Sequence, residues 1–129
     1  MAASILIIED VDSMRCLLEH LIQSVEGLSV SGLAASGWEA RLEVHRRRPD
    51  LVLLDEVLPG ESSEALLNEF RVLLLPVLLI SGAFDTERPL WEGALGRLQK
   101  PTWDSLEGDQ IRFKQKIRAA LARNSSQSG

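Results

Sequence analysis

The sequence predicts one doubly wound α/β domain, in which a parallel sheet carries helices on both faces. Five short apolar or β-branched runs alternate with stretches of helical periodicity along the 129 residues. Strands that alternate with helices form βαβ crossovers, and such crossovers require parallel strands. Because the length fits a single core, we expect one domain over residues 1–123. The polar residues 124–129 are expected to be a disordered tail or the start of a linker.

The first strand and the first helix have the clearest patterns. Residues 4–8 (Ser-Ile-Leu-Ile-Ile) are an apolar run of the kind that forms a fully buried parallel strand, and Glu9 and Asp10 end it. Ser13 is a candidate helix cap, and apolar residues recur at helical spacing from there to Val25. This stretch predicts a helix.

The middle of the chain repeats the pattern. Residues 28–34 have strand character, and residues 37–47 are predicted to be a helix. That helix should end just before Pro49, because the residue that precedes a proline disfavours helical geometry. Residues 51–54 (Leu-Val-Leu-Leu) then form another buried strand, which Asp55 ends.

The last part of the chain is predicted to continue the alternation of helices and strands. The predicted elements are a helix over 62–73, a strand over 77–80, a short helix over 87–95, a strand over 98–99 and a helix over 108–123. The short helix contains Pro89 and Gly93, both of which destabilise a helix interior.

Composition excludes several classes of function. The net charge of −5 argues against binding of nucleic acid by phosphate neutralisation. No apolar run approaches the roughly 20 residues of a membrane-spanning helix, and the first residues lack the features of a signal peptide. We therefore expect a cytoplasmic protein that does not bind membranes. The single cysteine, Cys16, cannot form an internal disulfide, and no Cys/His cluster has zinc-type spacing.

Polar side chains stand at the ends of four predicted strands. They are Glu9, Asp10, Asp55, Ser81 and Lys100. They should converge, because ligand sites of such sheets lie beyond the carboxyl ends of the strands. Three carboxylates within about 4 Å would repel by roughly 4 kcal/mol per pair at an effective dielectric of about 20. Lys100 offsets one charge, and Mg²⁺ suits the others because it binds carboxylates and phosphate oxygens. A carboxylate in such a site can attack a phosphoryl donor.

The order and spacing of these residues resemble the response regulator receiver family of bacterial two-component signalling. Four segments carry the resemblance, namely 5–15 (ILIIEDVDSMR), 51–60 (LVLLDEVLPG), 76–82 (PVLLISG) and 100–101 (Lys-Pro). The likeness covers nearly the whole chain and is in some details similar to the receiver of a chemotaxis methylesterase. It implies a flavodoxin-like fold with strand order 2-1-3-4-5.

The resemblance implies a phosphorylation site that contains Mg²⁺. Asp55 would be the phosphoacceptor and also a metal ligand. Asp10 would be a direct metal ligand, Glu9 would act through a water molecule, and the backbone carbonyl of Val57 would complete the site.

The resemblance also implies how the site is used. Ser81 is similar to the family's switch hydroxyl, and Lys100 is similar to the lysine that contacts the phosphoryl group. A sensor histidine kinase would be the donor, and a downstream protein or a tethered output domain would be the target. The chain would be a monomer or weak dimer with no enzymatic activity beyond its own phosphorylation and dephosphorylation.

Four features depart from the family's pattern. Arg97 occupies the switch position that usually holds an aromatic residue. It could respond electrostatically in place of the aromatic residue, or it could be a solvated charge on an edge strand, which is the interpretation we favour. The segment between Ser81 and Lys100 is a few residues shorter than is usual in the family. Ser63 stands where a glycine is common, which is unfavourable if the backbone needs a positive φ. Val57 is apolar and cannot orient a hydrolytic water towards Asp55.

These departures leave an alternative open. The chain could be a degenerate receiver that binds a partner protein independently of phosphorylation. A phosphatase of another doubly wound family is disfavoured, because such enzymes need a second acid two residues after the nucleophile and Val57 stands there.

Overall fold

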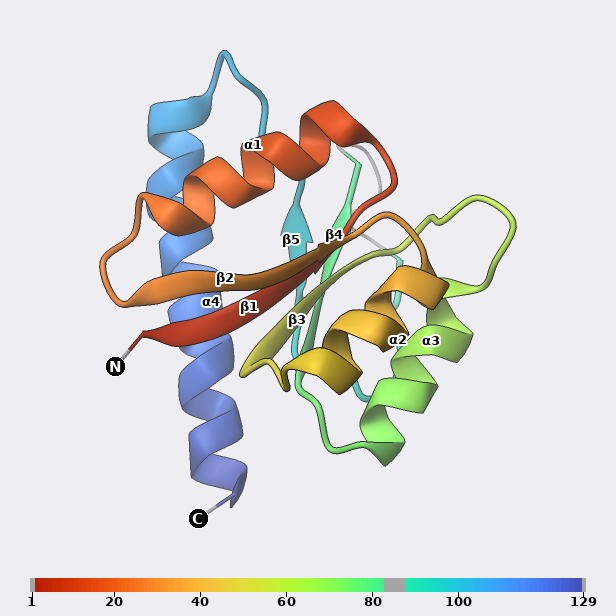
Figure 1. Ribbon diagram of the computed structural model, residues 1–129. Helices are drawn as coiled ribbons and strands as arrows, with labels where there is room; N and C mark the ends of the chain where they lie inside the picture. Colours follow the sequence, from red (N-terminus) through yellow and green to blue (C-terminus); the bar gives the residue numbers. More distant parts are fainter. Residues whose placement is uncertain (1, 83–87, 129) are drawn as a thin grey trace.

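A five-stranded parallel sheet forms the centre of the computed structural model, which describes residues 2–82 and 88–128 (Figure 1). The strands are β1 (Ala3–Ile8), β2 (Leu28–Ala34), β3 (Leu51–Asp55), β4 (Val77–Ser81) and β5 (Arg97–Gln99). Their order is β2-β1-β3-β4-β5, and all four pairs of neighbours are parallel. The predicted fold class and strand order are therefore confirmed.

Helices cover both faces of this sheet. They are α1 (Asp12–Gln23), α2 (Gly37–Arg46), α3 (Ser63–Val72) and α4 (Leu106–Ser128). In Figure 1, α1 and α4 lie on one side of the sheet, and α2 and α3 lie on the other. None of the helices described has the length and apolar content that a membrane crossing requires.

The central strands are apolar on both sides because each face of the sheet packs against a layer of helices. Ile5 and Ile7 of β1 belong to the core that includes residues of α1 and α4. Leu6 and Ile8, which alternate with them, belong to the core formed with α2 and α3. Side chains along a strand point alternately to its two faces, so a strand buried on both faces must be apolar throughout.

Helix starts differ in how they are capped. Ser36 accepts a hydrogen bond from Glu39 N (3.2 Å) at the start of α2, and Ser62 accepts one from Ala65 N (3.1 Å) at the start of α3. Helix α1 instead starts at Asp12, so the prediction that Ser13 caps it is wrong.

The connection between β4 and β5 also differs from the prediction. A short helix was expected over residues 87–95, but the described residues 88–96 contain none, while Glu87 lies outside the described residues. Gly93 has a φ of 93°, which no helix accommodates. The backbone instead bonds to the sheet, since Leu95 N donates to Val77 O at 2.8 Å. The parts of the chain described here thus contain four helices rather than five.

The last helix is longer than expected. Helix α4 starts at Leu106 rather than residue 108 and continues to Ser128 rather than ending at residue 123. Residues 124–128, predicted to be a disordered tail or linker, therefore continue the helix in this structure, and residue 129 lies outside the described range.

We predict that the layer between α3 and the sheet is essential for stability. Leu67 of α3 is fully buried, so Leu67→Ala should lower the free energy of unfolding by about 2–5 kcal/mol. Leu42 of α2 is 54% exposed, so Leu42→Ala should change it by less than about 0.5 kcal/mol. Urea denaturation measures both values, and equal losses in the two variants would contradict this assignment of the core.

Candidate functional site

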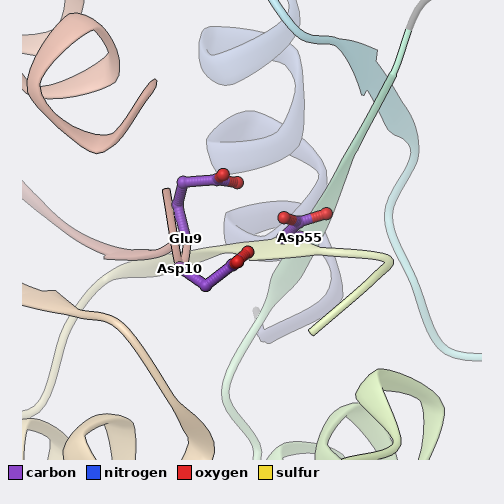
Figure 2. Close-up of side chains that lie close together, drawn as sticks. All are labelled: Glu9, Asp10 and Asp55. Atoms are coloured by element: carbon purple, nitrogen blue, oxygen red, sulfur yellow. The ribbon is translucent and has the colours of Figure 1, made fainter. Parts of the chain in front are cut away.

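The pairing of β1 with β3 brings acidic residues together at the carboxyl edge of the sheet. Ile8 pairs with Leu54, so the next residues along the two chains, Glu9 and Asp55, lie next to each other across the pair of strands. Glu9, Asp10 and Asp55 each offer one carboxylate oxygen, and these three oxygens lie within 4.8 Å of one another. Figure 2 shows the three carboxylate groups turned towards a common space. The predicted acidic cluster is therefore formed.

The other two strands place Ser81 and Lys100 at the same edge. Asp55 pairs with Ile80, which directly precedes Ser81 on β4, and Ser81 pairs with Gln99, which directly precedes Lys100. Lys100 N donates to Ser81 O at 2.8 Å, which continues the ladder one residue past β5. Ser81 is buried and lies at the strand end next to that of Asp55.

The Lys100 ammonium contacts this cluster. Its Nζ lies 3.0 Å from Asp55 Oδ2 and 3.0 Å from Glu9 Oε2. Burial lowers the pKa of Lys100, but its hydrogen bonds to Asp55 and Glu9 outweigh burial, so the pKa is raised overall. Lys100 therefore stays charged while it bridges the ends of β1 and β3.

One positive charge does not compensate Glu9 fully. The Glu9 side chain is inaccessible to solvent. Burial, together with the nearby Asp55 carboxylate, raises the pKa of Glu9 to about 7, although Lys100 acts in the opposite direction. The pocket thus favours a proton or another cation at this position.

The residues of the cluster fit a divalent metal ion. Glu9 Oε2 is buried, and none of the described residues donates a hydrogen bond to it, although Lys100 Nζ is close. Three carboxylates that carry more negative charge than the Lys100 ammonium offsets are a suitable donor set for a hard cation such as Mg²⁺. Val57 N donates to Asp55 Oδ1 at 3.0 Å, which shapes the loop after β3. The metal-binding role of the Val57 carbonyl stays a prediction.

Sequence reasoning missed Glu56 and misjudged Arg97. The Glu56 side chain has no exposed surface, and both of its carboxylate oxygens contact the Arg97 guanidinium. Only 12% of the Arg97 side chain is exposed, so the interpretation of Arg97 as a solvated edge charge was wrong. The sequence contains one signal for this ion pair, because an acid follows directly after one apolar strand and a base lies within another. Buried charges require partners, so the two could be expected to pair.

The concern about Ser63 is resolved by the position of α3. Ser63 is the first residue of that helix and is buried, so its backbone is helical and needs no positive φ. The positive φ in this region, 75°, falls on Gly60, where the chain turns between β3 and α3.

Comparison with known proteins gives consistent results. The family described as the response regulator receiver domain matches residues 5–107. A protein-glutamate methylesterase/protein-glutamine glutaminase of Syntrophus aciditrophicus is 37% identical over 92% of this chain and 35% of its own length. One from Pseudomonas aeruginosa is 32% identical over 94% of this chain and 36% of its own length. The chain therefore spans about a third of the length of these relatives.

A solved structure shows the same fold. The response regulator domain of Thermotoga maritima CheB matches with a TM-score of 0.82 at 22% identity, over 95% of this chain and 98% of that domain. The similarity supports the strand order and layers described above.

The raised pKa of Glu9 predicts a pH-dependent stability in the absence of metal. The folded chain keeps a proton on Glu9 that the unfolded chain releases above about pH 4.5, so stability falls as the pH rises towards 7. In Glu9→Gln this fall in the free energy of unfolding should be smaller by about 3 kcal/mol.

Urea denaturation at a series of pH values, with a chelator present, measures this difference. Glu64→Gln, which changes an exposed acid of α3, is the matched control and should behave as the unmodified chain does. Identical pH profiles for Glu9→Gln and the unmodified chain would contradict the assignment.

Proposed function

Because the chain belongs to the response regulator receiver domain family, we propose that it is a signalling switch in which Asp55 accepts a phosphoryl group. Membership of this family generally implies that a histidine kinase is the partner. The observation that carries the proposal is the contact of Asp55 with both a metal-compatible acidic cluster and the Lys100 ammonium, whose Nζ is 3.0 Å from Asp55 Oδ2. An attacking carboxylate needs positive charge on both sides of the transferring phosphoryl group.

The proposed reaction is a phosphoryl transfer between two side chains. One Asp55 oxygen forms a bond to phosphorus while the bond from phosphorus to the imidazole nitrogen of the kinase histidine breaks. The imidazole leaves with the electron pair. The Lys100 ammonium offsets negative charge on the phosphoryl oxygens during the transfer.

The metal site would be built from the residues already described. Asp10 and Asp55 would hold Mg²⁺ directly, Glu9 would act through water, and the Val57 carbonyl would complete the set. When bound, the ion would supply positive charge to the phosphoryl oxygens.

The output would be a change of shape at the edge of the sheet. Ser81, at the end of the neighbouring strand, would hydrogen-bond to the new phosphoryl group and draw the chain after β4 inward. Inverting a 1:99 population of two states takes about 5.5 kcal/mol of differential affinity. The target of the switch would be a separate protein or a tethered output domain. The likeness to methylesterase/glutaminase chains supports a tethered output domain.

A second candidate function is supported by one observation. Arg97 is fixed in an ion pair with Glu56, at the position where the family usually has a mobile aromatic residue. This arrangement would suit a receiver that binds its partner without phosphorylation. Phosphorylation of the purified chain distinguishes the two functions.

We predict that the chain takes up one phosphoryl group on Asp55. Incubation with acetyl phosphate and Mg²⁺, followed by intact mass measurement, should show one phosphoryl adduct on the unmodified chain and none on Asp55→Asn. Asp104→Asn, at an exposed aspartate before α4, is the matched control and should still gain the adduct. Absence of an adduct on the unmodified chain would favour the phosphorylation-independent module.

We further predict a long-lived phosphoryl group. Val57 is 70% exposed two residues beyond Asp55, and its side chain cannot orient a water for hydrolysis. Val57→Asn supplies such a group and should shorten the lifetime about tenfold, or about 1.4 kcal/mol in the barrier. The decay of the adduct mass measures the lifetime, and the exposed substitution Val72→Asn is the control. Rapid decay in the unmodified chain would contradict this prediction.

A further inference from the structure

Helices α2 and α3 lie side by side on one face of the sheet (Figure 1). At their starts, the Glu61 carboxylate accepts a hydrogen bond from the backbone N–H of Gly37, the first residue of α2, at 3.0 Å. At their ends, Arg48 Nη2 donates to the carbonyl of Leu73 at 2.9 Å. The two helices therefore run in the same direction and are joined at both ends.

The solvent side of these helices, over residues 37–48 and 61–74, is named the α2–α3 face, and it contains a groove. The groove has a volume of about 340 Å³ and lies between the second halves of the two helices. Val44, Phe70 and Leu73 contribute apolar side chains to its lining. It therefore has room for a large apolar side chain of another molecule.

A tryptophan lies at the other end of the α2–α3 face. Trp38 is in the first turn of α2, and 68% of it is exposed. Burial of a tryptophan removes a large apolar area from water, so its exposure forgoes that stabilisation. Tryptophan is also enriched among the residues that dominate binding at protein–protein interfaces. Trp38 is therefore the best candidate on this face for a binding anchor.

The turn after α3 exposes a second large apolar side chain, and its backbone is strained. Leu74 has a φ of 60° and is 81% exposed. A leucine is disfavoured in this left-handed conformation, which glycine adopts freely. Arg48 holds the turn, because its Nη2 also donates to the carbonyl of Leu74 at 3.1 Å. Burial within the chain does not offset the strain, whereas contact with another molecule would.

Charge is segregated along the α2–α3 face. Acids lie at the start, where Glu39 and Glu64 are in the first turns of α2 and α3. Cations lie at the end, where Arg46 and Arg47 close α2. This order follows the helix macrodipole. It also makes the face complementary to a second copy of itself that is turned end for end.

We propose that the α2–α3 face binds the same face of a second copy of this chain, with the helices of the two copies antiparallel. A two-fold axis that crosses the helices at right angles near the middle of α2 places Trp38 of each copy opposite His45 of the other copy, which lines the groove. Trp38 then occupies that groove, where the Arg48 guanidinium favours an aromatic ring. Each contact is made twice because the interface is symmetric.

The charges and the size of the face define what kind of dimer forms. Glu39 and Arg47 are exposed, and each faces the other residue in the second copy. Helices of ten residues are about 15 Å long, so two of them bury less than the roughly 1,200 Å² of a stable complex. The dimer is therefore weak and depends on chain concentration. It forms without phosphorylation, and so goes beyond the function proposed above.

Sedimentation velocity over a range of chain concentrations, without a phosphodonor, measures the association. The average mass of the unmodified chain should rise from one chain towards two. Trp38→Ala should raise the dissociation constant more than about 100-fold, because an aromatic anchor is lost twice. Trp103→Ala is the matched control, since Trp103 is 58% exposed and its ring lies 6.3 Å from that of His20 in α1, on the other side of the sheet. It should associate as the unmodified chain does.

Charge reversal tests whether the partner is a second copy. Glu39→Arg and Arg47→Glu should each remain single chains, because each brings like charges together twice. An equal mixture of the two variants should recover the dimer, because both contacts then join opposite charges. Glu107→Arg and Lys114→Glu, which reverse exposed charges of α4, are the matched controls and should each associate normally.

Two features of the design guard against misfolded variants. Glu39 accepts a hydrogen bond from Ala35 N at 3.2 Å, so its replacement weakens the start of α2, but recovery of the dimer in the mixture requires both variants to be folded. Leu74→Gly is independent of this contact. Because glycine tolerates the positive φ, its thermal stability should not fall, while association weakens at least about tenfold.

Each measurement has a result that overturns the proposal. The proposal is refuted if the unmodified chain stays single at every concentration. It is also refuted if Trp38→Ala or Leu74→Gly associates as the unmodified chain does, or if the charge-reversed variants fail to pair when mixed. Phosphoryl uptake takes no part in these measurements, so they are independent of the test of the proposed function.

Discussion

Among the described residues, the carboxylates of Glu9, Asp10 and Asp55 and the ammonium group of Lys100 meet at the carboxyl edge of the sheet, and this imbalance of charge governs the site. The parallel register brings Glu9 and Asp55 level, and Lys100 bridges them at 3.0 Å. Since one ammonium cannot neutralise three buried or half-buried acids, the pocket retains a proton on Glu9 or binds a further cation. A site with this balance of charge suits a phosphoryl group accompanied by a metal ion.

A second charge arrangement begins one residue further along the same strand. Asp55 is directed to Lys100, and Glu56 is directed to Arg97 and Arg88. Because the two acids pair with different cations, each buried charge has its own partner, and two consecutive acids can both be buried. The arrangement also anchors both ends of the three-residue strand β5. Arg97, its first residue, contacts Glu56, and Lys100, the residue after the strand, contacts Asp55.

The sequence was informative where local pattern decides the structure and uninformative where distant contacts do. Apolar runs predicted the central strands, and strand-end acids predicted the cluster, because parallel strands bring their carboxyl ends to one edge. Two features depend on residues that are far apart in sequence: the course of the connection that contains Gly93, and the ion pair of Arg97. Hydrophobic periodicity gives no information on either. A buried ion pair between Glu56 and Arg97 joins residues 41 positions apart, so local reasoning treated the arginine as solvated.

The most direct test of the account is a titration with Mg²⁺ followed by backbone amide chemical shifts. The account predicts that the shifts change together at the ends of β1 and β3, around residues 9–12 and 55–57, and that Asp10→Asn removes this response. Binding that leaves these amides unchanged, or that persists in Asp10→Asn, would contradict a metal site between the acids and Lys100.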